Sequence, residues 1–162
     1  MLRAMLLDLA DHRRIPPRAL LLAVAAAVPF WALALLSLGL TSSVRPGLAV
    51  TAAIAYGALT LAFMGGVRCG LAIGPYGARR QENELALAAL APLGGFVAIL
   101  LPPALGVSLL IAALLLQALW DMMSAETGRL PHWFSRLRLL LTAAAVIPLL
   151  AILGRLVLTA LR

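Results

Sequence analysis

The chain has 162 residues, of which 64% are hydrophobic and 12% are charged, and its formal net charge is +7. One domain of this length cannot bury so much apolar surface in water, so a soluble globular protein is excluded and an integral membrane protein is expected. All 13 basic residues are arginines, and most lie in short segments between apolar runs. This pattern favours a bilayer and its anionic lipids as partners over nucleic acid.

Residues 1–16 predict a short amphipathic helix that lies at the membrane interface. Leu2, Met5 and Leu9 fall on one helical face, and the charged side chains lie largely off that face. Pro16 and Pro17 then interrupt the helix before the first long apolar stretch begins.

Five apolar stretches follow, and together they predict an all-α, polytopic membrane helix bundle. The stretch after Arg13 and Arg14 is longer than the apolar core of a signal peptide, so we expect it to remain as a span. Residues 17–162 are expected to form one transmembrane domain with spans at 18–40, 48–73, 85–101, 104–120 and 138–160.

The third and fourth stretches are short and are separated by Pro102 and Pro103, which predicts a tight hairpin. A helix of about 17 residues is roughly 25 Å long, which just crosses a bilayer if the hairpin stands nearly upright. A re-entrant hairpin, with three true spans elsewhere, is the alternative.

The arginines predict the orientation. In a five-span arrangement nine of them share one side, and only Arg45 and Arg162 lie on the other. The positive-inside rule then places the N-terminus in the cytoplasm and the C-terminus on the opposite side. A composition rich in arginine, alanine and leucine suggests a bacterial inner membrane. The nine arginines are Arg3, Arg13, Arg14, Arg18, Arg79, Arg80, Arg129, Arg136 and Arg138.

Arg68 lies inside the second span, about five residues from its cytoplasmic end. Asp121 ends the fourth span in the same leaflet, so an Arg68–Asp121 ion pair is expected, with Gln117 one turn away as a further acceptor. Two alternatives are plain snorkelling of Arg68 to the interface and a contact with a substrate or a lipid phosphate.

Glycines surround this arginine. Gly66, Gly70 and Gly74 recur every four residues, and Gly65 precedes the first. Such spacing gives a helix a smooth face that another helix can approach closely.

An aromatic pair, Trp133 and Phe134, precedes Arg136 and Arg138 at the start of the last span. Rings at headgroup level and arginines facing lipid phosphates predict an interfacial or lipid anchor. A protein-docking surface is the alternative.

No set of residues predicts catalysis, a cofactor or a metal site. His12 and His132 have no other ligand at metal-binding spacing, and Cys69 is the only cysteine. Serines and threonines lack a histidine or lysine base in a shared apolar segment. We therefore do not expect an enzyme.

Several segments resemble an uncharacterised bacterial and mitochondrial family that includes the transmembrane protein 69 group. The resemblance covers residues 18–160 and implies a small inner-membrane protein of about five spans with no known activity. This chain has Cys69 where the family is expected to carry an aromatic residue. The segments are VPFWALAL, YGALTLAFMGGVRCGLAI, LLPPALG, LLQALWD and GRLPHWFSRLRLLLT.

These observations together favour an accessory, assembly or stabilising subunit that packs against a larger inner-membrane complex, with other membrane-protein subunits as partners. The alternative is a small transporter, a channel or an anionic-lipid-binding membrane protein that uses Arg68 and Asp121.

Overall fold

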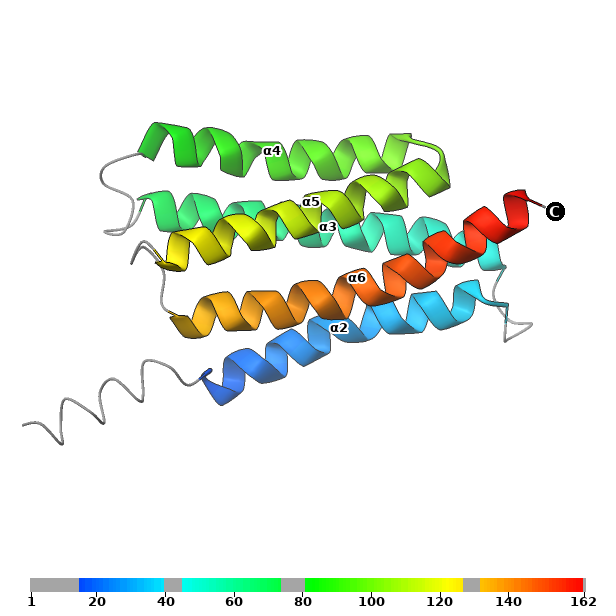
Figure 1. The fold of residues 1–162 in the computed structure, drawn as a ribbon, viewed down its shortest axis with the longest axis horizontal. Coiled ribbons are helices and arrows are strands. Elements are labelled where there is room, and N and C mark those ends of the chain that lie inside the picture. Colours follow the sequence, from blue (N-terminus) through cyan, green and yellow to red (C-terminus); the bar gives the residue numbers. More distant parts are fainter. Residues whose placement is uncertain (1–14, 40–44, 74–80, 127–131, 162) are drawn as a thin grey trace, which may run out of the picture.

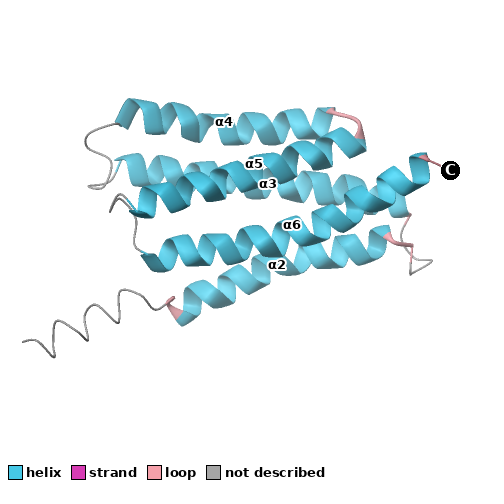
Figure 2. Cartoon of the chain, viewed as in Figure 1, coloured by secondary structure: helices cyan, strands magenta, loops and turns pink. Residues whose placement is uncertain are grey.

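In the computed structural model, the described residues are 15–39, 45–73, 81–126 and 132–161, and they are almost entirely helical. Figure 2 shows no strand among them. The five helices are α2 (Pro17–Ser37), α3 (Pro46–Ile73), α4 (Gln81–Leu100), α5 (Pro103–Glu126) and α6 (His132–Ala160).

The helices form one bundle (Figure 1). α3 contacts α2, α4 and α5, and α6 packs between α2 and α5. The described chain begins at one end of the bundle and finishes at the opposite end, as expected for five passes. The predicted helix bundle is therefore confirmed.

Prolines and a glycine set the helix boundaries. Pro17, Pro46 and Pro103 stand at helix starts, where the missing N–H is not needed and the fixed φ suits the first turn. Gly39 follows α2 with a φ of 73°, a left-handed conformation that favours glycine at a helix end.

Small residues let the helices approach closely. A Cβ added at Gly95 would lie 2.9 Å from the carbonyl oxygen of Ala58, and one at Gly106 would lie 2.4 Å from that of Ala98. Close approach maximises van der Waals contact between helices in a membrane, where the lipid is as apolar as the protein core. The largest fully buried apolar side chains are Leu61, Val107, Leu110, Pro148, Leu149 and Ile152.

Four of the helices are long and apolar enough to cross a membrane: α2, α3, α5 and α6. The apolar part of α4, Leu85–Leu100, is shorter. At 1.5 Å per residue this apolar part is about 24 Å long, somewhat less than the hydrocarbon core of about 30 Å. The protein is thus a multi-pass helical membrane protein.

Three helix ends differ from the prediction by four residues or more. α4 begins at Gln81 instead of residue 85, α5 continues to Glu126 instead of ending at residue 120, and α6 begins at His132 instead of residue 138. The prediction took Asp121 and Arg138 as markers of helix ends, but both side chains are buried against each other inside the bundle. The interfacial helix predicted for residues 1–16 lies almost wholly outside the described residues.

Candidate functional site

A buried carboxylate joins three helices near one end of the bundle. Asp121 of α5 is 1% exposed and contacts arginines from α3 and α6. Its Oδ1 lies 2.7 Å from Nε of Arg68, and its Oδ2 accepts a hydrogen bond of 2.5 Å from Nε of Arg138. We call Arg68, Asp121 and Arg138 the charged cluster.

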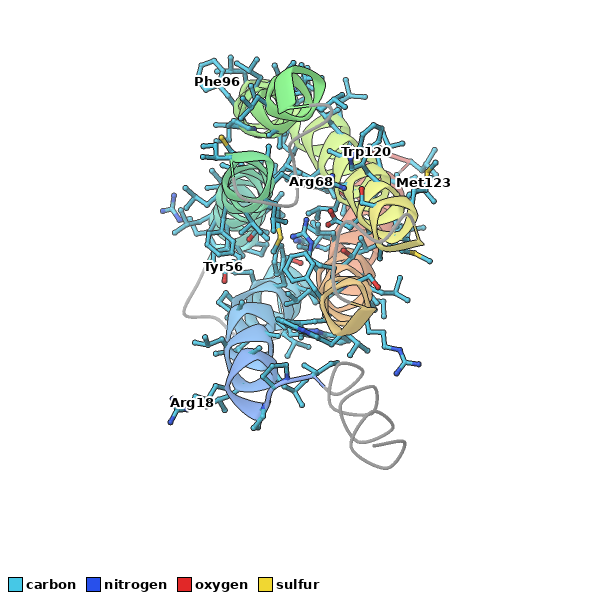
Figure 3. All side chains as sticks on the ribbon, turned by 90° about the vertical axis from the view of Figure 1, so that its left-hand side faces the viewer. Arg18, Tyr56, Arg68, Phe96, Trp120 and Met123 are labelled. Atoms are coloured by element: carbon cyan, nitrogen blue, oxygen red, sulfur yellow. The ribbon has the colours of Figure 1, made fainter. Side chains whose placement is uncertain are left out.

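Arg68 points from α3 into the bundle, toward α5 (Figure 3). Its Nη2 donates to the Ser124 hydroxyl at 3.2 Å, and that hydroxyl donates to the carbonyl oxygen of Trp120 at 2.9 Å. The guanidinium carbon also lies 5.5 Å from the centre of the Trp120 ring, within the range of a cation–π contact. Arg68 is therefore held by groups of α5 on several sides.

The two arginines bind the carboxylate differently. The Nε of Arg138 makes an aligned hydrogen bond to Oδ2. The 2.7 Å contact between Arg68 Nε and Oδ1 is an ion pair without the alignment of a hydrogen bond. The first contact combines charge with direction, whereas the second is an electrostatic contact.

Arg138 lies in a different place from the one its sequence position suggests. It was predicted to reach outward to lipid phosphates with Arg136, but it is 6% exposed and faces Asp121. Its guanidinium carbon is 5.9 Å from the Phe134 ring, which meets Trp133 edge-to-face. Arg136 is exposed, so Arg136 alone of these two arginines faces outward.

The cluster holds the bundle together at the end where α3 finishes and α6 begins. Each guanidinium and the carboxylate loses its hydration on burial, and the contacts within the cluster recover part of that loss. Removal of one member of a buried ion pair typically costs about 3–5 kcal/mol, because it leaves an uncompensated charge. The cluster therefore acts as a clamp between α3, α5 and α6.

Beside the clamp is an apolar cavity of about 610 Å³ that we call the α2–α3–α6 cavity. Arg138 and Gln117 lie in its wall, and the Oε1 atom of Gln117 is buried without a hydrogen-bond partner. The sequence prediction placed Gln117 near Arg68 as an acceptor, and the structure assigns it no such bond among the described residues. The wall also includes Ala19, Leu22, Ala23, Ala27, Phe30, Tyr56, Leu59, Phe63, Trp133, Leu141 and Thr142.

The predicted glycine face of α3 divides into two parts. Gly65 is buried against α4, where an added Cβ would lie 2.6 Å from the Ala88 carbonyl oxygen. Gly66 and Gly70 are exposed, and an added Cβ at either would meet nothing within 4 Å. Gly74 lies outside the described residues.

The structure therefore brings Arg68 and Asp121 together and adds two residues that the sequence analysis did not place in the site, Ser124 and, as an inward-facing group, Arg138. One signal was present in the sequence: Arg138 stands in the same leaflet as Asp121. Among the described residues, no group of three histidine, cysteine or acidic side chains is placed to hold a metal ion. The arrangement is suited to binding and packing.

One comparison with known proteins gives a match. A family model described as a protein of unknown function, DUF3429, matches residues 15–154, a range that includes the charged cluster and the α2–α3–α6 cavity. No curated protein and no solved structure gives a significant match. The expected resemblance to an uncharacterised family is confirmed: the chain belongs to DUF3429, a family of proteins of unknown function.

Proposed function

We propose that this protein is a non-catalytic membrane subunit that assembles with a larger membrane complex or stabilises it. The observation that carries the proposal is the outward part of the α3 glycine face. Gly66 and Gly70 leave open space on the surface of the bundle, whereas Gly65 beside them is already filled by α4. A helix of a partner protein could pack closely against Gly66 and Gly70, as α4 packs against Gly65.

Large apolar side chains flank the two open glycines. Phe63 and Ile73 are 68% and 67% exposed, and they lie one turn before Gly66 and one turn after Gly70 on the same side of α3. Such an alternation of bulky and small residues forms a groove, which allows a partner helix to approach closely. We call Phe63, Gly66, Gly70 and Ile73 the outer α3 face.

The charged cluster supports a structural role. Arg68 and Asp121 contact each other and are both buried, so we assign them to the clamp and not to a transported ion. A clamp at this end would fix α3 relative to α5 and α6, and a fixed α3 would offer a partner a preformed surface. The role requires no reaction and no cofactor.

We place the protein in a bacterial inner membrane, with its N-terminus in the cytoplasm and its C-terminus on the opposite side. The uneven distribution of arginines supports this orientation. The positions of the two ends of the described chain, at opposite ends of the bundle, agree with it. Reporter fusions at the two termini test it: activity of a cytoplasmic reporter at both ends would contradict the assignment.

Site-specific photocrosslinking in native membranes tests the assembly role. A photoreactive residue at Ile73 should give a discrete protein adduct, because Ile73 belongs to the outer α3 face. Leu116 on α5 is a matched control, since it is 66% exposed but lies on another surface. Adducts of equal yield from both positions, or none from Ile73, would contradict the proposal.

A further inference from the structure

We propose that the α2–α3–α6 cavity binds a membrane phospholipid with an anionic headgroup, whose phosphate lies beside Arg138 and one of whose acyl chains lies between the helices. The volume of about 610 Å³ falls within the range of about 300–1,000 Å³ that is usual for small-molecule sites. The proposal does not depend on the assembly role, because it rests on the cavity and not on Gly66 and Gly70.

The cavity has the depth of one leaflet. Its wall on α2 runs from Ala19 to Phe30, which is about 16 Å at 1.5 Å per residue. Half of a hydrocarbon core is about 15 Å thick. An acyl chain that enters beside the start of α2 would therefore reach the inner end of the cavity near the middle of the membrane.

The cavity opens sideways toward lipid. Leu22 and Leu59 line it and are 71% and 68% exposed, so its rim between α2 and α3 meets the surrounding acyl chains. A phospholipid can therefore enter from its own leaflet without leaving the membrane, and its second chain can remain outside the rim.

Hydroxyl groups in the apolar part are already used by the protein. The Tyr56 hydroxyl donates to the Ala26 carbonyl oxygen at 2.9 Å, and the Thr60 hydroxyl donates to the Tyr56 carbonyl oxygen at 2.8 Å. The Tyr56 ring also meets the buried Phe30 ring edge-to-face, with centroids 4.9 Å apart. Tyr56 and Thr60 therefore do not compete with the apolar contacts that this part of the cavity offers an acyl chain.

The other end carries groups that suit a phosphate. Among the described residues, Arg138 makes its hydrogen bond to Asp121 through Nε, so its Nη groups remain for a ligand in the cavity that Arg138 lines. A guanidinium binds phosphate oxygens through two such donors. Trp133 lies in the wall at this end, which is the headgroup level usual for tryptophan.

Charge distinguishes an anionic headgroup from a zwitterionic one. Two guanidiniums share the single carboxylate of Asp121, so the charged cluster carries a net charge of +1 and favours a headgroup whose own net charge is negative. A phosphate that carries only glycerol brings no second cation to this end. We therefore infer a preference for phosphatidylglycerol over phosphatidylcholine with the same acyl chains.

Native mass spectrometry of the purified full chain tests the site after incubation with phosphatidylglycerol, phosphatidylcholine or oleate. The expected result is retention of one phosphatidylglycerol, with a preference of about tenfold or more over phosphatidylcholine, because the net positive charge of the cluster favours the headgroup that has a net negative charge. Equal retention of the two phospholipids, binding of oleate alone, or retention of no lipid would overturn the proposal.

Two variants and one control variant locate the site. Ala23→Phe places a ring in the cavity and should abolish the retained lipid, whereas Ala25→Phe, on the exposed side of α2, should leave it unchanged. Arg138→Gln should reduce the preference for phosphatidylglycerol to within about threefold, since Arg68 and Asp121 alone leave the cluster without a net positive charge. If Arg138→Gln fails to fold, the comparison of Ala23→Phe with Ala25→Phe still tests the site. Equal lipid retention by these two variants would overturn the assignment to this cavity.

Discussion

Arg138 and Asp121 lie on different helices and meet through a hydrogen bond of 2.5 Å between Nε and Oδ2, with both side chains buried. This contact agrees with α5 continuing past Asp121 and with α6 beginning before Arg138, where the sequence suggested a helix end and a helix start. A buried carboxylate that contacts two guanidiniums no longer needs water, so the helices can carry these charges inside the bundle.

Replacement of the carboxylate should destabilise the protein strongly. Asp121→Asn keeps the shape of the side chain but leaves Arg68 and Arg138 buried without the charge that they share. We expect the free energy of unfolding to fall by about 3–5 kcal/mol, as for the loss of one partner of a buried ion pair. Unfolding by SDS in mixed micelles measures it, and a loss below about 1 kcal/mol, the value of an exposed pair, would contradict the clamp.

The two neighbouring glycines of α3 should respond in opposite ways to the same substitution. Gly65→Ala forces a Cβ against the Ala88 carbonyl oxygen and should cost about 1–3 kcal/mol of stability, as overpacking does. Gly66→Ala meets open space and should be neutral or stabilising by up to about 1 kcal/mol, since alanine favours a helix. Thermal unfolding in detergent compares them, and equal melting temperatures would show that α4 does not pack on Gly65.

A second pair of neighbours tests the packing of α6. Leu149 is fully buried and Leu150 is 50% exposed. Leu149→Ala should cost stability near the lower end of the usual range of about 2–5 kcal/mol, because lipid is as apolar as the core and only packing is lost. Leu150→Ala should change the free energy of unfolding by less than about 0.5 kcal/mol. The reverse order in an SDS titration would mean that α6 is rotated from its position in this fold.

The number and approximate positions of the helices follow from the sequence, because long apolar runs broken by prolines leave a membrane chain few alternatives. The Arg68–Asp121 contact could be anticipated because both residues are rare charges in one leaflet. The inward orientation of Arg138 could not be anticipated, since an arginine near the start of a helix can equally well face the surface. The split between Gly65 and Gly66 depends on the rotation of α3 against α4, which helical spacing alone does not fix.

The cavity could not be predicted from the sequence either. Its wall combines residues from four helices, and α2 contributes mainly small side chains such as Ala23 and Ala27 that carry no motif. Only the packing of α2 against α3 and α6 leaves this volume unfilled. Arg138 belongs to both the clamp and the cavity wall, so the structural role of the cluster and the proposed lipid site both depend on its position.

A double-mutant cycle between Arg138 and Asp121 tests the central claim most directly. Arg138→Met and Asp121→Asn, alone and together, should give a coupling free energy of about 1–3 kcal/mol in mixed-micelle unfolding, as for residues in direct contact. The same cycle with Arg136→Met is the control, because Arg136 is exposed and should couple by less than about 0.5 kcal/mol. Coupling near zero for Arg138, or equal coupling for both arginines, would contradict a buried charged cluster that clamps these helices together.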